Sequence, residues 1–65
     1  MEELRRARGS AEIRLTAAEL LIINNALNEI CNGIDLPEFH SRIGVERAAA
    51  ERLLGEIGAL LRRLG

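Results

Sequence analysis

The amino-acid sequence predicts an all-α domain in which two long amphipathic helices form a hairpin and a short helix joins them. Two observations indicate this fold. First, apolar residues recur at alternating intervals of three and four positions in two long segments, which is the spacing of one helix face. Second, a capping residue is followed three positions later by glutamate in two segments flanked by apolar residues, Thr16 to Glu19 and Asp35 to Glu38.

The first ten residues precede this helical domain. Residues 1–10 surround a lone Leu4 with charged side chains, which is too little apolar surface to bury, so we expect a flexible N-terminal arm. Residues 11–65 are predicted to form a single helical domain.

One short strand is predicted where this domain begins. Apolar and charged side chains alternate along Ala11–Leu15, which is the period-two pattern of a strand with one apolar face. Because no second segment reads as a strand, we expect this strand to pair with the same strand of another copy. Ile13 and Leu15 are therefore candidate self-association residues.

The first long helix is predicted from Thr16 to about Asn32. Thr16 accepts the first hydrogen bond as its cap, and Gly33 ends the helix in a left-handed conformation. Its packing face consists of five apolar residues in 3-4-3-4 spacing, Leu20, Ile23, Leu27, Ile30 and Ile34.

The short joining helix and the second long helix follow. Asp35 is expected to cap a helix from Leu36 to about Ile43, which ends at Gly44. The last helix is predicted from about Val45 to Leu64, with a packing face in the same spacing formed by Ala50, Leu53, Ile57, Leu60 and Leu64.

Length and composition limit the possible functions. A 65-residue chain with a single aromatic residue has a small aliphatic core, so association with other chains is a natural source of stability. The net charge of −1 gives no overall attraction to nucleic acid, and no apolar run approaches the ~18 residues that span a membrane. The single cysteine, Cys31, excludes an internal disulfide and favours a cytoplasmic location.

A row of amide side chains follows the first long helix and is a candidate partner-binding surface. Asparagine is a poor helix former, so several in one helix cost stability unless something uses them. With one apolar residue among them, they form a mixed surface of Leu21, Asn24, Asn25, Asn28 and Asn32. The alternative is that these amides bond to neighbouring turns or face water.

Small residues on the last helix are a second candidate for self-association. Gly55 and Ala59 lie near one line, with Gly58 close by, and glycine inside a helix costs about 1 kcal/mol relative to alanine. Such residues favour the close approach of another helix.

Residues 36–53 resemble a helix-turn-helix motif with Gly44 in the turn, since Phe39, Ile43 and Leu53 fall at positions that this motif buries. The resemblance implies that the start of the last helix contacts DNA, with Arg47 as the reading residue and Arg42 and Arg52 in support. Glu46 and Glu51 depart from this pattern because they would face phosphate.

The strand followed by helices also resembles the ribbon-helix-helix repressors, in part. That resemblance implies a dimer with paired N-terminal strands, which present Glu12, Arg14 and Thr16 outward. The family passes almost directly from its first helix to its second, whereas this chain inserts residues 35–43.

No combination of residues indicates catalysis, a metal or a cofactor. His40 is the single histidine and has no partner nearby in the sequence, and Cys31 reads as a small core residue. We therefore expect a non-enzymatic, self-associating helical module, a homodimer or larger homo-oligomer that also binds a protein partner. The alternative is a small DNA-binding regulator that uses residues 36–53, and a third possibility is an accessory partner of a larger protein.

Overall fold

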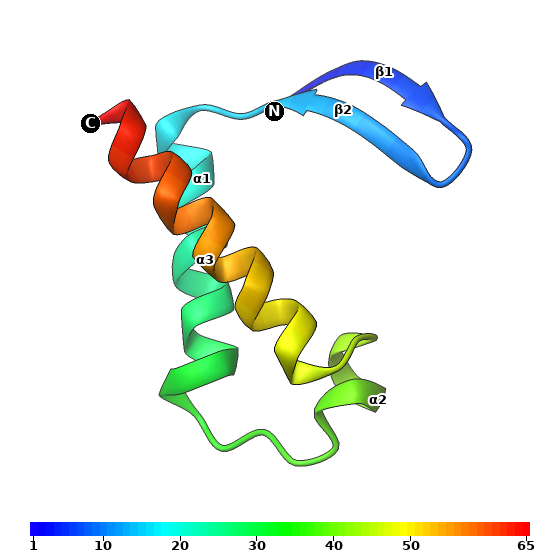
Figure 1. The fold of residues 1–65 in the computed structure, drawn as a ribbon, viewed down its shortest axis with the longest axis vertical. Coiled ribbons are helices and arrows are strands. Elements are labelled where there is room, and N and C mark those ends of the chain that lie inside the picture. Colours follow the sequence, from blue (N-terminus) through cyan, green and yellow to red (C-terminus); the bar gives the residue numbers. More distant parts are fainter.

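The computed structural model describes residues 1–65 and contains a β-hairpin followed by three α-helices and one π-helical turn (Figure 1). The prediction of an all-α fold is therefore wrong, because the protein combines a sheet with helices. The helices have 12, 5 and 18 residues, so the predicted pair of long helices is also wrong. The elements are β1 (Glu2–Ala7), β2 (Ser10–Arg14), α1 (Ala17–Asn28), the π-helix η1 (Glu29–Gly33), α2 (Phe39–Ile43) and α3 (Arg47–Leu64).

The two strands pair with each other in antiparallel register, from Glu2 opposite Arg14 to Ala7 opposite Ser10. A turn at Arg8 and Gly9 joins them, and Gly9 adopts the positive φ of 80° that glycine tolerates well. Residues predicted to be a flexible arm are thus a strand, and they supply in the same chain the partner that we expected from another copy. Opposite charges replace apolar side chains in the cross-strand pairs of β1, which is why the apolar pattern did not reveal this strand.

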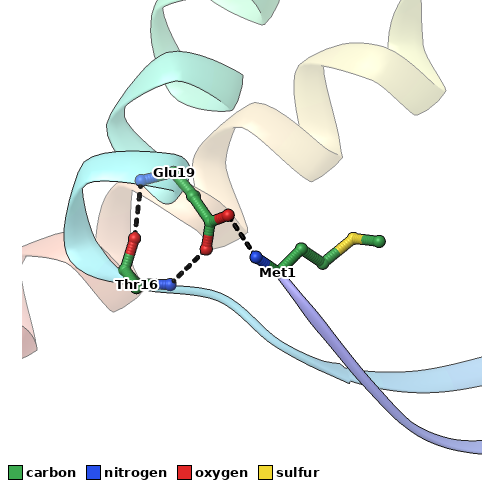
Figure 2. Close-up of polar contacts among 3 residues, drawn as sticks. All are labelled: Met1, Thr16 and Glu19. Atoms are coloured by element: carbon green, nitrogen blue, oxygen red, sulfur yellow. Dashed lines mark hydrogen bonds and ion pairs between the residues drawn. The ribbon is translucent and has the colours of Figure 1, made fainter.

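The predicted cap at Thr16 is confirmed, and it starts α1. The amide of Glu19 donates to Oγ1 of Thr16 at 3.1 Å, and the amide of Thr16 donates to the Glu19 carboxylate at 2.9 Å (Figure 2). Two otherwise unpaired amides of the first turn are satisfied in this way.

The end of α1 differs from the prediction. Gly33 does not have a positive φ, and the helix widens into η1 instead of ending in a left-handed cap. A Cβ at Gly33 would lie 2.6 Å from the Glu29 carboxylate, which is the end of a flexible, exposed side chain that can move aside. Neither the backbone conformation nor this contact requires glycine at position 33.

The predicted cap at Asp35 is wrong. The helix α2 begins four residues later, at Phe39, and follows a turn at Pro37 and Glu38. Glu38 has φ 54° and ψ 46°, and its side chain makes no capping hydrogen bond. Gly44 ends α2 with φ 98°, as predicted.

The left-handed conformation of Glu38 gives a testable stability prediction. A residue with a Cβ pays about 1 to 2 kcal/mol in this region, whereas glycine does not. We expect Glu38→Gly to raise the free energy of unfolding by about 0.5 to 1 kcal/mol in urea titrations, after the entropy that glycine adds to the unfolded chain. The matched control is Glu51→Gly, at an exposed position within α3. This variant should lower the free energy of unfolding by a similar amount. A decrease for both variants would contradict the conformation of Glu38.

The core of the protein is small. Buried Cys31, Phe39 and Ala50 form its centre, where η1, α2 and α3 meet, and Ile30, Leu36 and Leu54 pack around it. Leu20 is buried separately near the other end of α1. On α3 the buried or half-buried stripe is Ala50, Leu54, Ile57 and Leu61. The predicted packing face is therefore correct in part, since Leu53, Leu60 and Leu64 lie on its exposed side.

The shape of the chain is open. The accessible surface is 5181 Å², whereas a compact protein of 7.2 kDa exposes about 4,100 Å². The radius of gyration is 13.1 Å, against about 11 Å for a compact 65-residue domain. Figure 1 shows the cause, since the hairpin extends away from the helices instead of lying on them. None of the helices combines the length and the apolar character needed to cross a bilayer.

Candidate interaction surface

The most distinctive surface is an apolar cleft of about 330 Å³ between the hairpin and the helices. We call it the apolar corner. It is lined by Arg14 and by six apolar side chains from the hairpin, from the start of α1 and its preceding link, and from the end of α3: Leu4, Ile13, Leu15, Leu20, Leu60 and Leu64.

Local structure places these side chains on one side. In β2, alternation turns Ile13 toward the helices and Glu12 toward the opposite face, whereas Arg14, which pairs with Glu2, also lines the corner. Leu4 lies at the irregularity in β1, where no residue of β2 stands opposite it. Leu60 and Leu64 are one turn apart on α3, so they line the other wall.

The corner is only partly covered by the chain itself. Leu4 and Leu64 are just over half exposed, at 51% and 53%, and Ile13 and Leu60 at 44% and 36%. Leu20 forms the floor and is buried. Contiguous apolar side chains of this size at the surface of a small protein mark a contact site.

The charged side of the hairpin has a different character. Arg14 bonds to Glu2 at 3.0 Å, and Arg5 lies 3.3 Å from Glu12, both across the two strands. All four side chains are more than half exposed, so each pair contributes well under 1 kcal/mol to stability. These pairs favour the observed register of the strands.

An ionised carboxylate lies close to this corner, at the start of α1. The terminal ammonium group of Met1 pairs with the carboxylate of Glu19 (Figure 2). This ammonium group and the Thr16 amide lower the pKa of Glu19 from 4.5 to about 2. The pairing joins the start of β1 to the start of α1.

The lowered pKa of Glu19 predicts how stability depends on pH. Between about pH 4.5 and pH 2 the unfolded chain takes up a proton that the folded carboxylate does not, so the free energy of unfolding falls as the pH falls. We expect wild type to exceed Glu19→Gln in stability by a constant amount above pH 4.5, and the difference to vanish near pH 2. Urea titrations between pH 2 and pH 6 measure it, and a difference that does not change with pH would contradict the pairing.

The structure brings two of the four predicted self-association residues into the corner. Ile13 and Leu15 line it. Gly55 faces open space on the exposed surface of α3, and Ala59 is half-buried outside the corner. Gly58 lies where α3 meets α1, and a Cβ there would make an ordinary van der Waals contact, 3.6 Å from Oδ1 of Asn24.

The predicted partner-binding row follows α1 and η1, with Asn25, Asn28 and Asn32 exposed and Asn24 half-buried against α3. Its amides bond to one another: Asn32 donates to Asn28 at 3.0 Å, and Asn24 donates to Asn25 at 3.4 Å. Leu21 is half exposed among them. The row is thus internally paired, and it stands apart from the residues that line the corner.

The three arginines of the DNA-binding alternative are not equivalent. Arg42 and Arg52 are exposed. Arg47 is half-buried, donates to the carbonyl oxygen of Cys31 at 2.8 Å, and lies 4.6 Å above the centre of the Phe39 ring. It therefore joins η1, α2 and α3, so its guanidinium group is already engaged within the chain.

Sequence reasoning missed two members of the corner. Leu4 lies in the segment predicted to be a flexible arm, because the charged residues around it show no apolar alternation. Leu20 was assigned to helix packing, and it also forms the floor of the corner. Cys31 is a free, buried core residue, and His40 is exposed on α2.

Comparisons of the chain with protein-family models, with curated proteins and with solved structures gave no match. A function therefore has to be argued from the surfaces of this chain.

Proposed function

We propose that this chain is a small protein-interaction module that self-associates as a homodimer through the apolar corner. The observation that carries the proposal is the exposure of Leu4, Ile13, Leu60 and Leu64 around one cleft. Burial of apolar surface is the main source of association energy, at about 25 cal/mol per Å². These side chains gain most from a contact that removes them from water.

The exposed area supports a second copy as the occupant. The chain exposes about 1,000 Å² more than a compact protein of its mass. A stable protein interface buries about 800 Å² on each partner, so the excess is the size of one such interface. Two-fold homodimers are the commonest assemblies, and a two-fold contact uses the same patch on both subunits.

Three further features fit this proposal. The hairpin makes little contact with the helices, and a two-stranded hairpin is only marginally stable by itself, so a second chain would hold it in place. The buried core has four residues, so burial of the corner in a dimer would add to a small stability of the single chain. The free thiol of Cys31 fits a reducing compartment, and we place the module in the cytoplasm as part of the same proposal.

The DNA-binding alternative finds less support. Its central residue, Arg47, already holds the Cys31 carbonyl and the Phe39 ring, and the start of α3 carries two glutamates, Glu46 and Glu51. Contacts to phosphate need several free cations on one surface. We therefore do not extend the proposal to nucleic acid.

The solution mass tests the proposal. Sedimentation equilibrium over a wide range of protein concentrations should give a mass of twice 7.2 kDa that falls toward 7.2 kDa on dilution. A mass of 7.2 kDa throughout would overturn self-association.

A further inference from the structure

We propose that β1 of one copy pairs in antiparallel orientation with β1 of the second copy, so that the two hairpins form a four-stranded sheet across the dimer. The inference rests on the proposed self-association and specifies how it is built. It does not use residues 11–15, whose strand partner is β1 of their own chain.

The outer edge of β1 is free to pair. The sheet has two strands, so one edge of β1 bonds to β2 and the other has no partner. Every residue of β1 is exposed. In Figure 1, β1 is the outer strand of the hairpin and β2 lies between it and the helical part. An uncovered edge offers unpaired amides and carbonyls to another strand.

The charge order in β1 matches a copy of itself. The strand reads Glu2, Glu3, Leu4, Arg5 and Arg6, so an acidic pair and a basic pair flank one leucine. The irregularity at Leu4 puts Glu2 and Arg5 on one face of the hairpin, and Glu3 and Arg6 on the other. Antiparallel pairing centred between Glu3 and Leu4 therefore sets Glu2 of each strand beside Arg5 of the other on one face. Parallel pairing in register sets like charges together. Opposite charges across strands stabilise a sheet and like charges destabilise it.

The free edge of β2 lacks this complementarity. Antiparallel pairing of two β2 strands about their centre places Glu12 opposite Glu12 of the second copy, and Arg14 opposite Ser10. Such a contact brings like charges together at its middle and leaves both arginines without an acidic partner. Charge therefore selects β1 as the edge that pairs.

The same arrangement joins the two apolar corners. A two-fold axis that relates antiparallel strands runs perpendicular to their sheet, so both hairpins turn their Leu4 and Ile13 toward the same side. The helices of the two copies then stand at opposite ends of the sheet, also on that side. Leu60 and Leu64 of both copies face one shared apolar space, which is how each copy covers the corner of the other.

A charge-reversed hairpin tests this strand pairing. The variant keeps the net charge and every charge pair within the hairpin, and it reverses the sign of each member: Glu2→Arg, Glu3→Arg, Arg5→Glu, Arg6→Glu, Glu12→Arg and Arg14→Glu. Two copies of the variant remain complementary, whereas a variant chain beside a wild-type chain meets like charges along β1. The two chains are mixed, unfolded and refolded together. Native mass spectrometry then measures the fractions of wild-type, variant and mixed dimers.

Each protein alone should form a dimer, and the mixed dimer should be about tenfold or more below the statistical one half, because the pair of Glu2 with Arg5 occurs twice in the dimer and both become repulsive. The deficit should shrink in 1 M salt, which screens exposed charges. A statistical amount of mixed dimer would overturn the strand pairing and leave self-association intact, and it is the result expected if these charges only protect the edge. Monomers throughout would overturn self-association itself.

A second pair of variants covers the case in which six substitutions prevent folding. Glu2→Arg with Glu3→Arg makes β1 wholly basic at these positions, and Arg5→Glu with Arg6→Glu makes it wholly acidic. Each variant alone should be monomeric by sedimentation, and an equimolar mixture should form the mixed dimer. Dimers of either variant alone, with no preference for the mixture, would overturn the strand pairing.

Discussion

Leu60→Glu is expected to weaken dimerisation by at least ~100-fold, since the two-fold symmetry places the new carboxylate twice in the interface. A charge moved from water into an apolar contact without a partner costs several kcal/mol, and 1.4 kcal/mol corresponds to a factor of ten in the dissociation constant. Leu60 is 36% exposed in the single chain, so the folded monomer tolerates the substitution. Sedimentation equilibrium of the variant should give a mass of 7.2 kDa where wild type is dimeric.

The matched control is Leu53→Glu. Leu53 is also a leucine of α3, is 47% exposed, and does not line the apolar corner. This variant should keep the association of wild type, with the same circular dichroism as Leu60→Glu. Equal weakening by both substitutions would show that the corner has no special part in association.

Phe39→Ala is expected to lower the free energy of unfolding by about 3 kcal/mol or more, the usual cost of removing a buried aromatic ring. Phe39 is 8% exposed and packs with Cys31 and Ala50 in the core. The substitution also removes the ring beneath the Arg47 guanidinium, 4.6 Å away. A 65-residue protein has a total stability of about 3 to 10 kcal/mol, so the variant should lose about a third of it or more.

Urea titration followed by circular dichroism measures this effect, at one fixed protein concentration because association adds to stability. Phe39→Leu is the control, since it keeps most of the buried apolar volume and should cost about half as much or less. Equal stability of Phe39→Ala and wild type would contradict the position of Phe39 at the meeting point of η1, α2 and α3.

The helical part could be predicted from the sequence because local signals and packing agree there. Thr16 and Glu19 form the expected cap, and α2 ends at Gly44 as expected. Helix spacing also identified the apolar residues of α3, although the chain buries only one side of that stripe. These features depend on neighbours within one or two helical turns, which a sequence displays directly.

The hairpin and the start of α2 could not be predicted in the same way. The strand β1 is held by charge pairs to residues seven and twelve positions away, and its sequence has no apolar alternation. At Asp35 the capping pattern is present, but the helix begins only at Phe39, where the ring reaches the core. Packing of one aromatic residue outweighed a local capping signal worth about 1 kcal/mol.

The candidate surface was predicted only where it depends on local pattern, and not where it depends on contacts between distant segments. Ile13 and Leu15 were identified because strand alternation marks the apolar face of β2. Leu4 and the end of α3 join that face only through the turn at Gly9 and the path of α1 and α3, which bring distant segments together. Arg47 appeared free in the sequence, and its bond to the Cys31 carbonyl arises only once η1 and α3 have packed.

The most direct test of the central claim is an isotope-filtered NMR experiment on an equimolar mixture of labelled and unlabelled chains, which detects contacts between subunits alone. We expect intermolecular contacts from the methyl groups of Leu60 and Leu64 to the apolar corner of the second copy, whose hairpin contributes Leu4 and Ile13. Absence of intermolecular contacts at the corner in a sample that sediments as a dimer, or a chain that stays at 7.2 kDa, would contradict the account.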